Sequence, residues 1–261
     1  MKNNNVLGAI LAIIGIVAGL LTFYLLALTY NPVIDSHVAV GRPDEGNTVR
    51  FVYALLGWLG VSAGALCVSV LYGFLKKQPW AWFWGVVAGT VLLLAGFFPM
   101  IPAADGGLTP VTGIVFFLAA ILWLGMLLVG GVNRKIIALL FVAGLAYVLT
   151  FINGVAPISR YQTTEGFWNG YFVIAQQLNW WSAAAWAIFS FAVVKRKSWA
   201  VPLGIFAASL SMIAGYPMAI HHMQTANRFS MFLPGPMMST IMLIIILLPS
   251  TQKLITTWQD A

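Results

Sequence analysis

Two short groups of residues have side chains suited to binding a metal ion. His221 and His222 are adjacent, and Asp35 and His37 are separated by one residue. Neutral imidazole is a good ligand for zinc and copper, and a carboxylate can complete such a site. Adjacent helical residues point about 100° apart, so His221 and His222 need a further ligand, which an extended Asp35–His37 segment could supply. These four residues are the candidate metal ligands, and the alternative is that the histidines bond to loop backbone.

A second group consists of side chains that carry amides and an indole within an apolar stretch. Gln176 and Asn179 are three residues apart, so they share one face of a helix, with Trp180 beside them. An amide at this depth cannot leave its donors and acceptors unpaired in lipid. The face that they form is therefore expected either to line a ligand pocket or to hydrogen-bond to neighbouring helices.

Asn153 precedes Pro157 near the end of another apolar stretch. Proline is expected to end the helix there, because it lacks a backbone N–H group, and to leave backbone carbonyls exposed. The polar residues Arg160, Glu165 and Arg228 follow in connecting segments on the same predicted side. Together with Asn153, Gln176, Asn179 and Trp180 they form the predicted ligand-binding set.

The elements that must position these residues are apolar helices. The chain has 61% hydrophobic and 7% charged residues, far less charge than the ~25% of a soluble domain. Most apolar stretches reach the ~20 residues that a helix needs to cross a bilayer. We therefore predict an all-α polytopic membrane protein with about eight transmembrane helices. The stretches are Val6–Leu28, Phe51–Leu75, Ala81–Ile101, Val111–Gly131, Ile136–Pro157, Tyr171–Val194, Val201–Ile220 and Met237–Leu248.

The connections between these stretches differ in length and charge. The odd-numbered ones, such as 29–50, 158–170 and 221–236, are expected to be long and irregular, and they hold the three histidines and most acidic residues. The even-numbered ones are short and, with the termini, carry nine of the 13 basic residues. Because cytoplasmic loops are enriched in Lys and Arg, we predict that both termini are cytoplasmic and that the protein lies in the plasma (inner) membrane.

A repeat is visible when residues 76–81 are aligned with residues 195–200, an offset of 119 positions. Both segments place two or three basic residues before Trp-Ala, and small residues continue the match into the next stretch. Such a repeat would divide the single integral membrane domain, residues 1–261, into halves 1–131 and 132–261. Since each half has four helices, the two halves would be parallel.

Three functions remain open. The first is a transport-type or hydrophobic-ligand-binding protein with an outward-facing polar vestibule. The second is a non-catalytic subunit or scaffold that docks other membrane subunits. The third is a membrane enzyme that acts on a lipid or quinone at the outer interface through His221, His222, Glu165, Asp35 and Arg228.

Missing features narrow these choices. The chain has no phosphate loop, dinucleotide fingerprint or nucleophile elbow, so an enzyme is the less favoured interpretation. It has no Asp, Glu, Lys, Arg or His at the middle of an apolar stretch, where proton relays and voltage sensors place such residues. The basic residues lie in short clusters between apolar stretches, so the expected partner is the lipid bilayer and not nucleic acid. No cofactor is identified.

Overall fold

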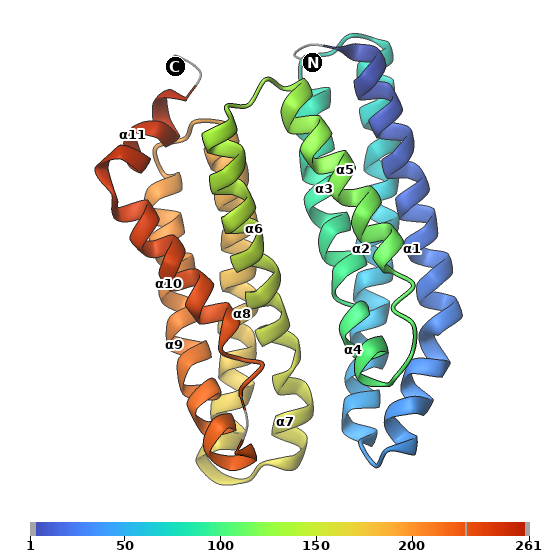
Figure 1. Cartoon of the computed structure of the whole chain (residues 1–261), viewed down its shortest axis with the longest axis vertical. Coiled ribbons are helices and arrows are strands. Elements are labelled where there is room, and N and C mark those ends of the chain that lie inside the picture. The colour runs from blue at the N-terminus through green and yellow to red at the C-terminus, as the bar shows by residue number, and fades with distance from the viewer. Residues whose placement is uncertain (1–3, 228, 259–261) are drawn as a thin grey trace. The chain divides into compact units, whose positions relative to one another are not determined.

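The computed structural model describes residues 4–227 and 229–258, and every regular element in these ranges is a helix (Figure 1). The chain divides into two compact units, with the boundary between Val132 and Asn133. Five helical segments are long and apolar enough to cross a membrane, or six if the bent pair of helices at the C-terminal end is one span. The chain is therefore a multi-pass helical membrane protein.

The N-terminal unit is a ring of four long helices with one short helix at its end. In this ring α1 packs against α2 and α5, and α3 also packs against α2 and α5. Successive long helices run in opposite directions, so the α1–α2 turn and α4 share the end opposite the α2–α3 turn (Figure 1). The helices are α1 (Asn5–Ala39), α2 (Pro43–Leu75), α3 (Ala81–Phe97), α4 (Met100–Asp105) and α5 (Gly113–Val129).

Small residues bring α1 and α2 together. A Cβ atom added to Gly19 would lie 2.6 Å from the Cα atom of Gly64, so the two backbones touch there. The opposite side of α1 is a stripe of exposed large apolar residues. The small residues thus allow α1 to pack closely against α2, and the large apolar residues can face lipid. The stripe consists of Val6, Ile10, Ile13, Val17, Leu20, Tyr24 and Leu28.

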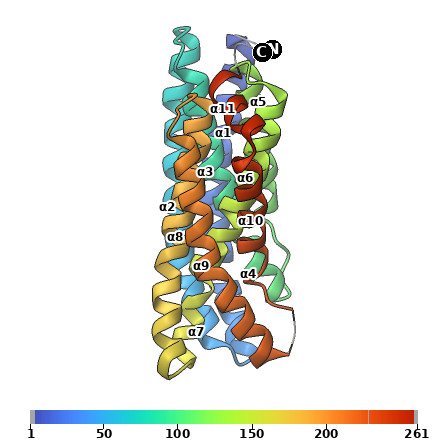
Figure 2. The same ribbon diagram turned by 90° about the vertical axis from the view of Figure 1, so that its left-hand side faces the viewer.

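The C-terminal unit is a second four-helix ring. Here α8 packs against α6 and α9, and α10 also packs against α6 and α9 (Figures 1 and 2). The last helix bends by 80° from α10, and the buried Trp258 donates a hydrogen bond from its indole to the carbonyl of Val193. The helices are α6 (Arg134–Val155), α7 (Pro157–Thr163), α8 (Gly166–Val194), α9 (Ala200–Ala226), α10 (Pro234–Leu247) and α11 (Pro249–Thr257).

We expected the odd-numbered connections to be long and irregular, but they are in large part helical. That prediction was therefore wrong. Helix α1 continues through Pro32 to Ala39, so only residues 40–42 join it to α2. Pro217 likewise lies inside α9. A proline removes one backbone hydrogen bond, and neighbouring helices and side chains can compensate for that loss in a membrane helix. The segment that contains Asp35 and His37 is therefore helical and not extended.

The two turns that carry the repeated sequence have the same backbone geometry. Lys77 and Arg196 both adopt left-handed backbone angles, with φ values of 53° and 54°. The amides of Gln78 and Lys197 each donate to the carbonyl five residues earlier, at 2.7 and 2.9 Å. Both helices thus end in the same type of C-terminal cap, in which one left-handed residue turns the chain back.

Candidate functional site

Buried polar side chains are concentrated in the C-terminal unit. Among the described residues of the N-terminal unit the buried polar side chains are Thr22, His37, Thr90 and Thr112. In the C-terminal unit they are Thr150, Asn153, Gln176, Asn179, Ser182, Ser211, His222, Ser230 and Ser239. All three predicted ligand-binding amides, Asn153, Gln176 and Asn179, lie in this second group.

Close contact between α6 and α8 brings the two asparagines to the same level of the unit. A methyl group on Gly154 would overlap the indole ring of Trp180, so the missing side chain of Gly154 makes room for that ring. Asn153 and Asn179 are the sequence neighbours of these two residues, and both are buried, at 1% and 0% exposure. The Gly154–Trp180 contact therefore fixes the height at which both amides enter the interior.

Asn153 links α6 to the start of α10. Its Nδ2 atom donates to the backbone carbonyl of Phe232 at 2.8 Å, and Gly235 at the start of α10 leaves space for the amide. Because a carbonyl only accepts hydrogen bonds, this contact fixes which end of the amide is nitrogen. The Oδ1 atom is buried and has no hydrogen-bond partner within the described ranges.

Asn179 and Trp180 leave two further groups without partners. Asn179 donates from Nδ2 to the carbonyl of Ala175, one turn earlier in α8, while its Oδ1 atom is buried and unpaired among the described residues. The indole N–H of Trp180 is in the same state. Gln176, buried at 7% exposure, lies one turn from Asn179 on the same face. Leaving one buried polar group unpaired costs about 1–3 kcal/mol of stability. Binding of a molecule that forms hydrogen bonds with these groups would recover that free energy.

Several other polar side chains in the interior of the unit make hydrogen bonds between helices. The hydroxyls of Thr150 and Ser211 are 3.2 Å apart, and Trp186 donates to the hydroxyl of Ser239 at 3.3 Å. Ser182 donates to a backbone carbonyl of α9 at 2.7 Å. These contacts join helices and need no further molecule. The two asparagines and Trp180 differ because a donor or an acceptor is left over.

The two neighbouring histidines have separate surroundings. The ring of His221 stacks on Trp168, with centroids 4.0 Å apart, while His222 is buried with its Nδ1 atom 3.1 Å from the Ser230 hydroxyl. Among the described residues, one group of potential metal ligands has its ligand atoms within 4.8 Å of one another, and it contains neither His221 nor His222. Asp35, the other predicted ligand beside His37, is exposed on α1.

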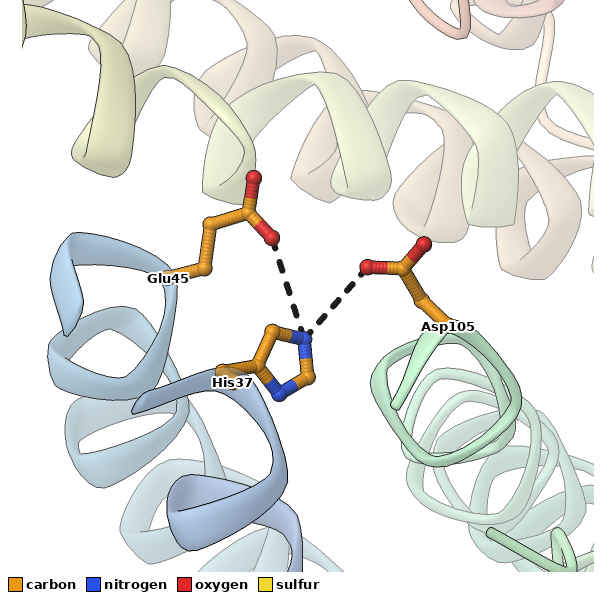
Figure 3. Close-up of side chains that lie close together, drawn as sticks. All are labelled: His37, Glu45 and Asp105. Carbon is orange, nitrogen blue, oxygen red and sulfur yellow. Dashed lines mark ion pairs between the residues drawn. The ribbon is translucent and has the colours of Figure 1, made fainter. Parts of the chain in front are cut away.

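That group is formed by His37, Glu45 and Asp105 in the N-terminal unit (Figure 3). The Nε2 atom of His37 lies 3.8 Å from a carboxylate oxygen of Glu45 and 3.5 Å from one of Asp105. Sequence reasoning selected His37 but missed both carboxylates. Glu45 was assigned to an irregular loop, and Asp105 is 68 positions away from His37 in the chain. Only the turn between α1 and α2 and the position of α4 bring them together.

The remaining predicted ligand-binding residues lie near the connections of the C-terminal unit. Arg160 is half-buried in α7 and Glu165 is exposed just before α8. In the part of the chain that the structure describes, neither side chain has a hydrogen bond or an ion pair with the amides of the interior. Arg228 lies outside the described residues.

No protein-family model, curated protein or solved structure matches this chain.

Proposed function

We propose that the protein is an eight-span membrane protein of the transport or ligand-binding type. Its C-terminal unit holds a small neutral polar group between Asn153, Gln176, Asn179 and Trp180. The observation that carries this proposal is a set of three buried groups that have no hydrogen-bond partner among the described residues: two amide oxygens that accept and one indole N–H that donates. A hydroxyl-rich or amide-containing molecule can supply the two donors and the acceptor that they need. The four residues carry no formal charge, which favours a neutral ligand.

The basic residues of the C-terminal unit support the proposed orientation. In the N-terminal unit Lys76 and Lys77 in the turn between α2 and α3 are matched by Arg42 and Arg50 at the opposite end, so this unit favours neither orientation. In the C-terminal unit the turn between α8 and α9 contains residues 195–197, all of them basic. By the positive-inside rule these turns and both termini would be cytoplasmic, in a plasma or inner membrane.

An internal repeat of four plus four spans is part of the same proposal. The equal left-handed turns at Lys77 and Arg196 and the same order of packing in the two rings support it. The boundary between the compact units also falls next to the expected boundary at residues 131 and 132. Repeated halves are common in transporters, which place their substrates among helices of such halves.

The test is purification of the full chain from its native membrane in mild detergent, followed by mass spectrometry of all bound proteins, lipids and small molecules. Wild type is compared with Asn179→Leu, which removes an unpaired oxygen, and with the control Asn47→Leu, which changes an exposed asparagine of the N-terminal unit. The proposal predicts a neutral polar compound at a constant ratio in wild type and control, but not in Asn179→Leu.

The other outcomes separate the alternatives. A protein that co-purifies at a constant ratio, with no small molecule, would make the chain a subunit whose partners are other membrane proteins. Identical contents in wild type and Asn179→Leu would reject the proposed site. The lipid bilayer is the expected surroundings in each case, because the exposed side chains of the helices are largely apolar.

A further inference from the structure

We infer that the N-terminal unit contains a zinc site formed by His37, Glu45 and Asp105. The three ligand atoms lie within 4.8 Å of one another at the end of the unit where α1 passes into α2 (Figure 3). The side chains come from α1, the first turn of α2 and the last residue of α4. This site lies in the other unit from the proposed ligand-binding amides and is independent of them.

The orientation of the His37 ring is the first argument. Its Nδ1 atom lies 2.8 Å from the backbone carbonyl of Val33, and a carbonyl only accepts, so Nδ1 carries the hydrogen. The lone pair of the neutral ring is then on Nε2, which faces the carboxylates of Glu45 and Asp105. His37 is only 2% exposed. A cation on Nε2, either a proton or a metal ion, would bridge this buried ring to the two carboxylates. Metal-bound histidines usually make the same second bond to a carbonyl or carboxylate.

The distances favour a metal ion over a proton as that cation. A hydrogen bond between an imidazolium and a carboxylate is about 2.7–2.9 Å long. The separations here are 3.5 and 3.8 Å. Zinc binds nitrogen and oxygen ligands at ~2.1 Å in a tetrahedron, which places neighbouring ligand atoms about 3.4 Å apart. The gap between Nε2 and the carboxylates thus has the width of a zinc coordination sphere, and three protein ligands leave one position for water.

Arg42 adds a competing charge to this site. Its NH1 atom lies 2.9 Å from the carboxylate of Glu45 and 2.6 Å from that of Asp105, and it meets the same oxygen atoms that face His37. The Arg42 side chain is 37% exposed, so it can move into solvent when the carboxylates bind a metal. Arg42 therefore neutralises the carboxylates without metal and opposes zinc binding. A metal site therefore predicts that zinc binds more tightly when Arg42 is removed. A cluster held together only by ion pairs predicts no zinc binding with or without Arg42.

The turn between α1 and α2 explains why these residues meet. Gly41 adopts a left-handed backbone with a φ value of 75°, and Pro43 begins α2. The amide of Arg42 donates to the carbonyl of His37 at 2.9 Å, which closes the turn. Glu45 follows in the first turn of α2 and is thereby brought back against the end of α1.

The experiment measures zinc binding to the purified full chain in detergent, after a chelator has removed bound metal. Zinc is titrated in competition with a chromophoric chelator, and the zinc content per chain is measured. The variants are Glu45→Gln, His37→Gln and Arg42→Gln, and the control Asp35→Asn removes an exposed carboxylate two residues from His37. Melting temperatures establish that each variant is folded.

We expect one zinc ion per chain in wild type and in Asp35→Asn. Glu45→Gln and His37→Gln should weaken binding by at least about 100-fold, because even changes outside the ligand shell cost about 10–100-fold. Arg42→Gln should tighten binding by at least about fivefold, since it removes a unit charge close to the metal. The partly exposed Glu45 keeps the test decisive if the His37 variant fails to fold.

Three results would overturn the inference. One is absence of zinc binding in both wild type and Arg42→Gln. Another is binding that Glu45→Gln leaves unchanged. The third is a bound zinc ion that is lost in Asp35→Asn or in His222→Ala but not in Glu45→Gln, which would place the metal on the other candidate ligands.

Discussion

The two buried asparagines of the C-terminal unit make different kinds of hydrogen bond. Asn153 donates to the carbonyl of Phe232 and so joins α6 to the turn before α10. Asn179 donates only within its own helix, to the carbonyl of Ala175. Each keeps a buried oxygen without a partner among the described residues. Both positions therefore offer an unused acceptor, but only Asn153 also joins two parts of the unit.

This difference predicts that replacing the two asparagines has different effects on the free energy of unfolding. Asn153→Leu should lower the free energy of unfolding by about 1–3 kcal/mol, because it leaves the buried carbonyl of Phe232 unpaired. Asn179→Leu should leave stability unchanged or raise it by up to ~1 kcal/mol, since it removes an unpaired buried oxygen and leaves only a carbonyl of the helix ladder. Thermal unfolding of both variants in detergent, without added ligand, measures this. Equal losses would contradict the account.

A second prediction concerns the contact between Gly154 and Trp180. Gly154→Ala should cost about 1–3 kcal/mol, because the added methyl group forces the indole ring to move. Gly144→Ala is the matched control in the same helix, where an added Cβ atom meets nothing within 4 Å. This control should gain up to about 1 kcal/mol from helix propensity. A tolerated Gly154→Ala would mean that Trp180 does not fix the level of the asparagines.

The sequence alone indicated part of the candidate sites. The spacing of Gln176 and Asn179 correctly predicted that both face the interior of the protein, because helical periodicity is local information. Which amide atoms stay unpaired depends on Phe232 and Gly235, which lie far away in the chain. For the same reason the association of Glu45 with His37 was not predicted.

Among the elements, the N-terminal unit depends on close packing between α1 and α2. Gly60→Ala should destabilise the protein by about 1–3 kcal/mol, because the new methyl group would overlap Thr22, a branched side chain with restricted rotamers. Gly57→Ala, one turn earlier in α2, meets only a Leu26 methyl at 3.8 Å and should be neutral or slightly stabilising. Melting temperatures of the two variants test this, and equal values would argue against a tight α1–α2 interface.

The turn after α2 allows a further prediction. Lys77 has a left-handed backbone that costs a residue with a side chain roughly 1–2 kcal/mol relative to glycine. Lys77→Gly should therefore raise the free energy of unfolding by about 1 kcal/mol. Lys76→Gly, at a φ value of −92°, serves as the control and should not stabilise the protein. A gain for both variants would point to relief of charge repulsion instead of backbone strain.

Helix identity was predictable from the sequence, but helix ends were not. Each of the eight apolar stretches has a helix at its centre, because long apolar segments have few other structures in a membrane. The ends depend on interfacial residues that are polar yet remain helical, as in residues 29–39 of α1. Helix α1 continues through Pro32 and α9 continues through Pro217, because the packing of neighbouring helices outweighs one lost hydrogen bond.

For the molecule as a whole, the proposed orientation can be tested by cysteine labelling. Cys67 is the single cysteine and is buried, so the wild-type chain should not react with a membrane-impermeant maleimide. A cysteine at the exposed position Glu165 should react in intact cells, whereas one at the exposed position Lys77 should react only after permeabilisation. The reverse pattern would place the basic turns and the termini outside.

The central claim is that the C-terminal unit binds a small polar molecule at the level of Asn153, Asn179 and Trp180. The most direct measurement is an experimental density map of the protein purified from its native membrane, at a resolution that shows ordered waters. We predict density larger than a water molecule within hydrogen-bond distance of at least two of the three unpaired atoms, the two Oδ1 atoms and the indole nitrogen. An interior in which these atoms pair with protein groups or with single waters would contradict the claim.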